Sequence, residues 1–87
     1  MPNHKSAIKR ALQNERRRTR NRHVISTLRT RVKQVKTAID VGDAETARSA
    51  LPVAVKALER AAGKGVIHRN QAQRRIGRLV RAVNQLG

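Results

Sequence analysis

The chain lacks several residue types on which small proteins often depend for stability. Its 87 residues include no Cys, Phe, Trp or Tyr, and only five Asp and Glu residues. Without Cys there is no disulfide, and without aromatic side chains the core loses its largest apolar anchors. The core must therefore be assembled from Ala, Val, Leu and Ile, and a chain of this length can hold one domain with one modest core.

Other absences limit the compartment and the chemistry. No stretch approaches the roughly 20 apolar residues that span a membrane, and the N-terminus lacks the apolar centre of a signal peptide. We therefore expect a cytoplasmic protein with no membrane partner. His4, His23 and His68 are far apart in sequence and have no Cys or clustered acids beside them. We expect no catalytic site, no metal, no cofactor and no small-molecule substrate.

The property that the chain has in excess is positive charge. Lys and Arg number 21, and the formal net charge is +16. Residues 1–36 hold twelve of them against Glu15 alone, residues 37–62 are nearly neutral, and residues 63–87 hold six with no acid. A merely solvated basic face normally carries acids for i,i+4 pairing, whereas like charges repel here. The charge therefore predicts a nucleic-acid partner, which would also stabilise a thin core.

A helical period runs through most of the sequence. Apolar residues recur at steps of three and four between residues 24 and 39, the spacing of one helix face. The residues upstream are good helix formers, so we predict one long first helix over residues 5–41, capped by Ser6 or Asn3. We expect it to end at Gly42. Its apolar seam consists of Val24, Leu28, Val32, Val35 and Ile39.

Two further apolar seams predict two further helices. The second helix is expected over residues 43–62, with Asp43 as its N-cap, and the third over residues 68–86. Pro52 lies inside the second helix and removes one hydrogen bond, so we expect a kink there, with a split into two shorter helices as the alternative. Residues 1–87 are thus predicted to form one all-α domain, a three-helix bundle with a long, protruding N-terminal helix.

The N-terminal half of the first helix cannot pack within this bundle. At 100° per residue its apolar seam centres at roughly 285°, and Arg17 falls at roughly 260°, which is the core angle. Burying an unpaired guanidinium there would be very costly, so we predict an arm that is accessible on all faces. Ile8 and Leu12 point away from the core angle and agree with that prediction.

Two basic elements are the candidate contact sites for nucleic acid. Along the first helix, a basic stripe at roughly 0° to 60° continues from the arm and can contact several phosphates. It comprises Arg22, Arg29, Lys33 and Lys36, with Thr19, Asn21, Ser26 and Thr30 as neutral donors. The second element is the start of the third helix, whose exposed amides favour phosphate. Because there are no aromatic side chains to stack bases, we expect recognition of RNA backbone and shape.

Specific residues along the whole chain resemble the bacterial small-subunit ribosomal protein S20 family. They are Asn3-His4-Lys5-Ser6-Ala7-Ile8-Lys9-Arg10, Arg18, Asn21-Arg22, Ser26, Arg29, Thr30 and Gly65-Val66-Ile67-His68-Arg69-Asn70. The resemblance implies a structural component of the small ribosomal subunit that binds directly to 16S ribosomal RNA and stabilises its fold during assembly. It further implies contacts with the RNA's 5′ domain and the long helix of its 3′ minor domain, and few protein contacts. Ile76-Gly77 departs from the Lys-Ser often found in the family, which leaves the third helix's contacts open.

The residues and the resemblance together define a predicted RNA-binding set. It consists of Lys5, Ser6, Lys9, Arg10, Arg16, Arg17, Arg18, Arg20, Asn21, Arg22, Arg29, Thr30, Lys33, His68, Arg69, Asn70, Arg74, Arg75 and Arg78. The alternative function that composition permits is an architectural DNA-binding protein. A membrane-active cationic helix is disfavoured, because such helices place Trp, Phe or Leu on a broad apolar face.

Overall fold

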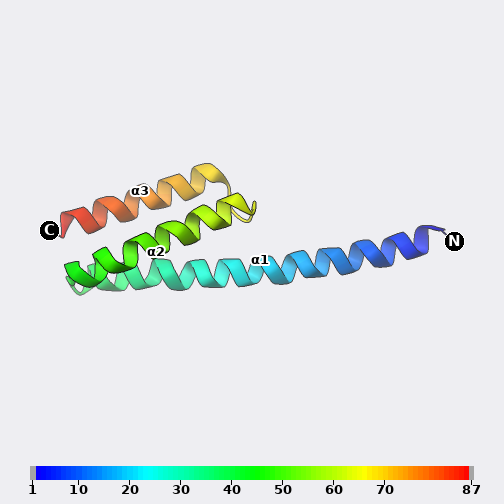
Figure 1. The fold of residues 1–87 in the computed structure, drawn as a ribbon, viewed down its shortest axis with the longest axis horizontal. Helices are drawn as coiled ribbons and strands as arrows, with labels where there is room; N and C mark the ends of the chain where they lie inside the picture. The colour runs from blue at the N-terminus through cyan, green and yellow to red at the C-terminus, as the bar shows by residue number, and fades with distance from the viewer. Residues whose placement is uncertain (1, 87) are drawn as a thin grey trace.

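Three helices make up the part of the chain that the structure describes (Figure 1). The structure, a computed structural model, describes the backbone of residues 2–86 and the side chains of residues 6–86. The helices are α1 (Pro2–Asp40), α2 (Ala44–Gly63) and α3 (Arg69–Gln85). Consecutive helices run antiparallel, and α2 packs against both α1 and α3, whereas α1 and α3 touch each other little. The predicted all-α class and the helical bundle are confirmed.

The molecule is elongated because α1 is about twice as long as its partners (Figure 1). Its principal extents are 65 × 21 × 14 Å and its radius of gyration is 17.6 Å, against about 12 Å for a compact chain of this length. Every residue from Ser6 to Arg20 is exposed, including Arg17 at the core angle. The N-terminal half of α1 is therefore the predicted arm, and residues 2–20 are called the arm below.

Each of the first two helices ends in a glycine turn that satisfies its last carbonyl groups. Gly42 has φ +76°, and its amide donates to the Ile39 carbonyl (3.1 Å) while the Asp43 amide donates to the Ala38 carbonyl (2.9 Å). Positive φ carries no Cβ penalty in glycine, which makes this double-bonded turn the favoured helix end. Gly65, with φ +75°, closes α2 by the same pair of bonds. These two turns set the antiparallel arrangement.

The helix starts confirm one predicted cap and correct another. Asp43 caps α2, because its carboxylate accepts hydrogen bonds from the Thr46 amide (3.1 Å) and hydroxyl. The prediction that Ser6 or Asn3 caps α1 was wrong, since the helix already begins at Pro2, and proline is well suited to a first turn. The helix α2 runs unbroken through Pro52, so the alternative of two shorter helices was wrong as well. The kink at Pro52 stays a prediction.

The core is thin and rich in alanine. Half of its buried side chains are Ala, which lets the helix axes approach closely, and no polar or charged side chain is buried among residues 6–86. Leu58 and Val35 are the largest side chains that are fully buried. The buried set is Leu28, Val35, Ala38, Ala47, Ala54, Leu58, Ala61, Ala72, Leu79 and Val83. With so few large side chains, each one carries a large share of the bundle's stability.

Leu58→Ala should destabilise the bundle strongly. Leu58 is 0% exposed, so the substitution leaves a cavity at the centre of α2, with an expected loss of about 2–5 kcal/mol in the free energy of unfolding. Urea denaturation followed by circular dichroism measures this loss. Leu12→Ala, at a 56% exposed arm position, is the matched control and should have little effect. Equal losses in the two variants would contradict the described core.

The stability that Asp43 provides should disappear in acid. The hydrogen bonds from the Thr46 hydroxyl and amide hold the pKa of Asp43 below its ordinary value of 3.8. Because the folded pKa is the lower one, the cap contributes fully above the unfolded pKa and is lost as pH falls through the folded pKa. The melting temperature of Asp43→Ala should therefore lie below that of the parent chain by a constant gap near neutral pH, and the gap should narrow below about pH 4.

Asp40→Ala is the control for this pH dependence. It removes the same charge from the last residue of α1, on the other side of the turn. A melting-temperature gap for Asp43→Ala that persisted unchanged into strong acid would show that the cap does not depend on the carboxylate.

Candidate nucleic-acid interface

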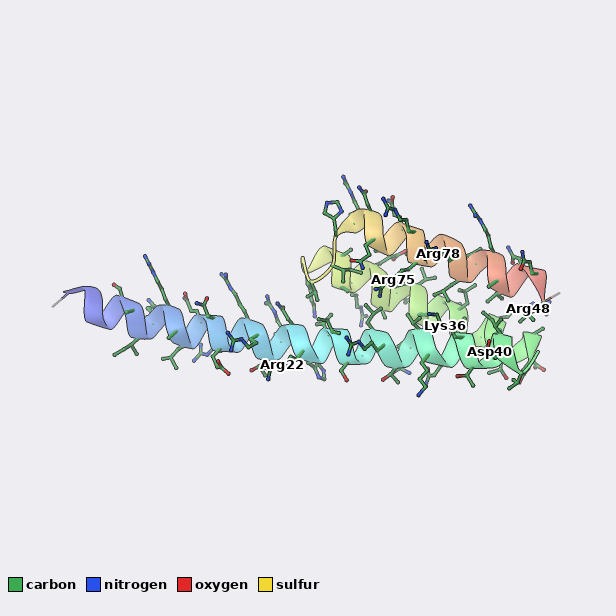
Figure 2. The ribbon with its side chains drawn as sticks, turned by 180° about the vertical axis from the view of Figure 1, so that it is seen from behind. Arg22, Lys36, Asp40, Arg48, Arg75 and Arg78 are labelled. Atoms are coloured by element: carbon green, nitrogen blue, oxygen red, sulfur yellow. The ribbon has the colours of Figure 1, made fainter. Side chains whose placement is uncertain are left out.

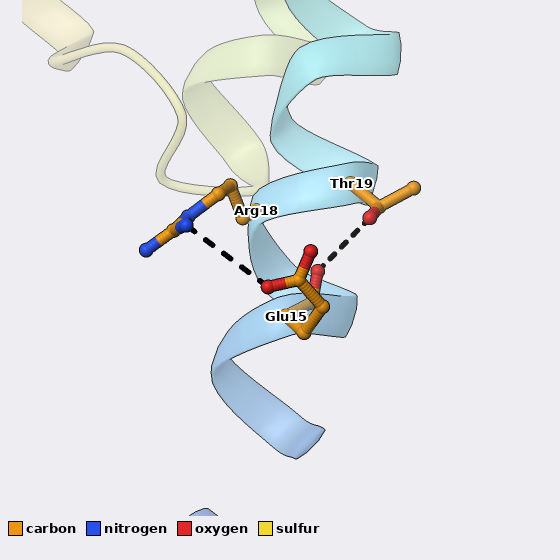
Figure 3. Close-up of polar contacts among 3 residues, drawn as sticks. All are labelled: Glu15, Arg18 and Thr19. Atoms are coloured by element: carbon orange, nitrogen blue, oxygen red, sulfur yellow. Dashed lines mark hydrogen bonds and ion pairs between the residues drawn. The ribbon is translucent and has the colours of Figure 1, made fainter. Parts of the chain in front are cut away.

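The arm presents cations that the protein itself hardly neutralises. Among the described residues the one ion pair joins Arg18 Nη1 to Glu15 Oε2 at 4.0 Å (Figure 3). Both side chains are about two-thirds exposed, and such surface pairs contribute about 0–1 kcal/mol. The remaining arm charges repel one another across one helix. A polyanion laid along the arm would remove that repulsion.

Two threonines on α1 are not free donors as the sequence suggested. The Thr19 hydroxyl donates to the Glu15 carbonyl (3.0 Å), as Figure 3 shows. The Thr30 hydroxyl donates in the same way to the Ser26 carbonyl (3.0 Å). Each hydroxyl hydrogen is thus used within the helix, and each oxygen faces outward as an acceptor. In this conformation Thr30 can accept a bond from a ribose 2′-hydroxyl but cannot donate to a phosphate, which corrects the predicted donor role.

A basic groove runs between α1 and α3, with a volume of about 580 Å³. It exists because α2 packs against both helices and keeps them apart. Figure 2 looks onto this face and shows Lys36 of α1 together with Arg75 and Arg78 of α3. No carboxylate lines the groove; its lining is Leu28, Arg29, Val32, Lys33, Lys36, Arg75, Arg78 and Leu79. The groove therefore joins members of both basic elements predicted from the sequence into one surface, with an apolar floor.

The start of α3 has a defined cap geometry. Nδ1 of His68 accepts a hydrogen bond from the Asn70 amide (3.1 Å), so this amide is already used within the protein. One of the amides that the sequence offered to phosphate at the start of the third helix is therefore engaged, and phosphate binding by the others stays a prediction. Since Nδ1 accepts, a neutral His68 ring carries its hydrogen on Nε2, which is a donor. His68, Arg69 and Asn70 are all exposed, and α3 begins at the end of the bundle from which the arm extends.

The predicted contact residues are spread over several places on the surface, and His68, Arg69 and Asn70 form one of these at the start of α3. Those from Ser6 to Arg22 lie on the arm and at its junction with the bundle, where Asn21 is half-buried and the others are exposed. Arg29, Lys33, Arg75 and Arg78 meet in the α1/α3 groove, where Lys36 joins them. Arg74 lies instead beside Gly77 and Arg81 on another face of α3. The side chain of Lys5 lies outside the described residues.

Sequence reasoning missed a second basic groove, between α1 and α2. Its cationic lining comes from Arg31 on α1 and from Lys56, Arg60 and Lys64 at the end of α2. The near-neutral average over residues 37–62 concealed Lys56 and Arg60, because most of the acids of that segment lie near the turn at Gly42. Spacing along α2 could have revealed them, since steps of four place Lys56, Arg60 and Lys64 close to one helix face.

The described residues contain neither a metal-binding cluster nor a membrane-spanning helix. Among the described part of the chain, no group of three or more His, Cys, Asp or Glu residues is placed to hold a metal ion. No helix within residues 2–86 combines the length and the apolar character needed to cross a membrane.

Exposed cations on a rigid arm and in grooves, without acidic partners, are the features of a nucleic-acid-binding protein. The family model described as Ribosomal protein S20 matches residues 2–84. Proteins named small ribosomal subunit protein bS20 from Geotalea uraniireducens, Trichlorobacter lovleyi and Geobacter sulfurreducens are 53%, 51% and 47% identical to the chain. Each alignment covers 87 residues and the whole of both chains. The chain belongs to the ribosomal protein S20 family.

Replacing Arg17, Arg18 and Arg20 together with Ala should weaken RNA binding while the bundle survives. All three side chains are exposed on the arm. The slope of log affinity against log salt should become shallower by roughly 0.7–0.9 for each phosphate that the variant no longer neutralises. Filter binding across a salt series measures the slope, and circular dichroism measures the helix content.

The control for this variant is Gln13→Ala, Asn14→Ala and Thr19→Ala, three uncharged positions on the same arm. It should leave the salt slope unchanged. Loss of the cooperative unfolding transition in the arginine variant would show that these arginines are structural and that the arm does not have the predicted role.

Proposed function

We propose that the chain is a structural component of the small ribosomal subunit in the cytoplasm, where it binds directly to 16S ribosomal RNA and stabilises its fold during assembly. The single observation that supports this most strongly is the family membership, which extends over residues 2–84. The full-length relatives carry the name of a small ribosomal subunit protein. Their names place those proteins in the subunit, and the basic surface of this chain suits the same position.

The arm and the α1/α3 groove supply the physical means of binding. Their cations neutralise phosphates that a folded RNA brings close together, and each contact releases counterions. With no aromatic side chain in the sequence, binding rests on backbone charge and shape rather than on base stacking. The residues proposed to make these contacts are the nineteen of the predicted set, from Lys5 to Arg78.

The proposal extends to the arrangement of the RNA and to the role of the whole chain. Residues 1–87 act as one RNA-binding unit that contacts the 5′ domain and the long helix of the 3′ minor domain, with few protein contacts and no catalytic activity. The extent of 65 Å supports contacts with two separated RNA elements, since the arm and the bundle lie at opposite ends of that axis.

Sedimentation of a cell lysate tests the subunit assignment. The protein should migrate with the small ribosomal subunit in low salt and stay with it well above physiological salt, because specific contacts with the folded RNA are far tighter than the non-specific charge binding that salt removes first. Migration with DNA, or at the top of the gradient in both salts, would contradict the proposal.

Competition between 16S ribosomal RNA and duplex DNA separates RNA binding from the architectural DNA alternative. Backbone charge alone would bind both, whereas the folded RNA offers the shape that the arm and groove fit. We expect RNA to displace DNA at equal phosphate concentration. Equal affinities would favour the DNA-binding alternative.

A further inference from the structure

We infer that the α1/α2 groove binds a second stretch of RNA backbone, separate from the stretch in the α1/α3 groove. This inference rests on the proposed function, because it names a further contact surface for the same ribosomal RNA. The groove has a volume of about 310 Å³. It is lined by His23, Val24, Thr27, Arg31, Val53, Lys56, Ala57, Arg60 and Lys64.

Lys and Arg are the only charged residues that line this groove. Arg31, Lys56, Arg60 and Lys64 give it four positive charges, and no carboxylate is among its lining residues. The described part of the chain contains no ion pair that involves any of the four. Cations near the end of α2 also interact favourably with its helix dipole, but that interaction does not account for Arg31, which belongs to α1 and lies outside the last turn of that helix.

The two grooves lie on opposite sides of the core seam of α1. His23, Thr27 and Arg31 fall at roughly 140° to 220° on the helix wheel, which is about 105° to one side of the seam at roughly 285°. The α1 cations of the other groove, Arg29, Lys33 and Lys36, fall at roughly 0° to 60°, about 105° to the other side. One RNA strand in one groove therefore leaves the other groove open.

Each groove continues into the arm along its own line of arginines. Arg16 and Arg20 fall at roughly 160° and 200°, in line with His23 and Arg31, so this stripe leads into the α1/α2 groove. Arg18 and Arg22 fall at roughly 0° and 40°, in line with the α1/α3 groove. All four arginines are exposed. Two lines of arginines thus lead from the arm and its junction with the bundle, one into each groove.

RNA backbone fits the groove better than an apolar or acidic protein segment. The lining offers no aromatic or large apolar pocket in which a protein side chain could anchor. Its cations are spread over two helices and continue along the arm, which suits a repeating row of phosphates. Val53, a lining residue that is 45% exposed, supplies an apolar surface for sugar edges.

Three double variants, each changing two exposed arginines to glutamine, test the inference. Arg31→Gln with Arg60→Gln removes two charges from the α1/α2 groove, one from each helix. Its affinity for 16S ribosomal RNA should fall, and the salt slope should become shallower by roughly 1.4–1.8, corresponding to two phosphates. The matched control, Arg48→Gln with Arg81→Gln, removes the same charge from outside both grooves and should change the slope little.

The third variant, Arg29→Gln with Arg78→Gln, removes two charges from the α1/α3 groove and separates two kinds of failure. If the parent chain binds ribosomal RNA and this variant is weakened, while the α1/α2 variant behaves like the control, the further inference is wrong and the proposed function stands. If the parent chain shows no preference for ribosomal RNA over DNA, the proposed function itself fails. If both groove variants are weakened, joining all four substitutions should multiply the two losses, as expected for separate sites.

Because the sequence has no native Cys, a single introduced Cys can report on RNA bound in the α1/α2 groove. Val53→Cys would create a single attachment site in the α1/α2 groove. A hydroxyl-radical source tethered there should cut ribosomal RNA at defined nucleotides, and cutting should weaken when Arg31 and Arg60 are also replaced. Intact RNA around a bound Val53→Cys protein would overturn the inference, because no strand could then lie in this groove.

Discussion

Mutual repulsion among unneutralised cations is the constraint that shapes this molecule. The two strongly basic helices, α1 and α3, scarcely touch each other, and the nearly neutral α2 lies against both. The helix that packs closely against both neighbours is thus α2, which carries acids and is rich in alanine. The basic faces of α1 and α3 lie at the edges of the bundle. The grooves are therefore a product of the same arrangement that allows so charged a chain to fold. Binding and stability use neighbouring faces of the same helices, and the core residues Leu28 and Leu79 also line the α1/α3 groove.

The alanine-rich core follows from that arrangement. A slab only 14 Å thick in its shortest dimension has little interior, so large side chains would protrude, whereas alanines let α2 approach both neighbours closely. The rest of the buried core consists of Leu28, Val35, Leu58, Leu79 and Val83. The marginal core also explains why a bound polyanion matters to stability, since a ligand that binds only the folded state shifts the folding equilibrium.

Much of the architecture could be predicted because local rules and tertiary packing agree. The seam from Val24 to Ile39, the glycine turn at Gly42 and the cap at Asp43 each specify their own conformation. The emergence of the arm followed from one arginine at a core angle. The α1/α2 groove was missed because charge averaged along a segment does not show which face carries it, although the four-residue steps along α2 held the signal. The cap geometry of His68 and the inward bond of Thr30 depend on rotamers, which a linear pattern does not encode.

The continuity of α1 has a consequence for the spacing of the whole chain. Because Pro2–Asp40 is one uninterrupted helix, the arm is joined to the bundle without a hinge, and its direction and rotation are both fixed. One residue inserted near the junction would advance the arm by about 1.5 Å and turn it by roughly 100°. Arginines aligned with one groove would then no longer line up with it. The helix thus sets both the angle and the distance between the arm and the bundle. The number of residues between them therefore decides how the arginines of the arm align with the grooves.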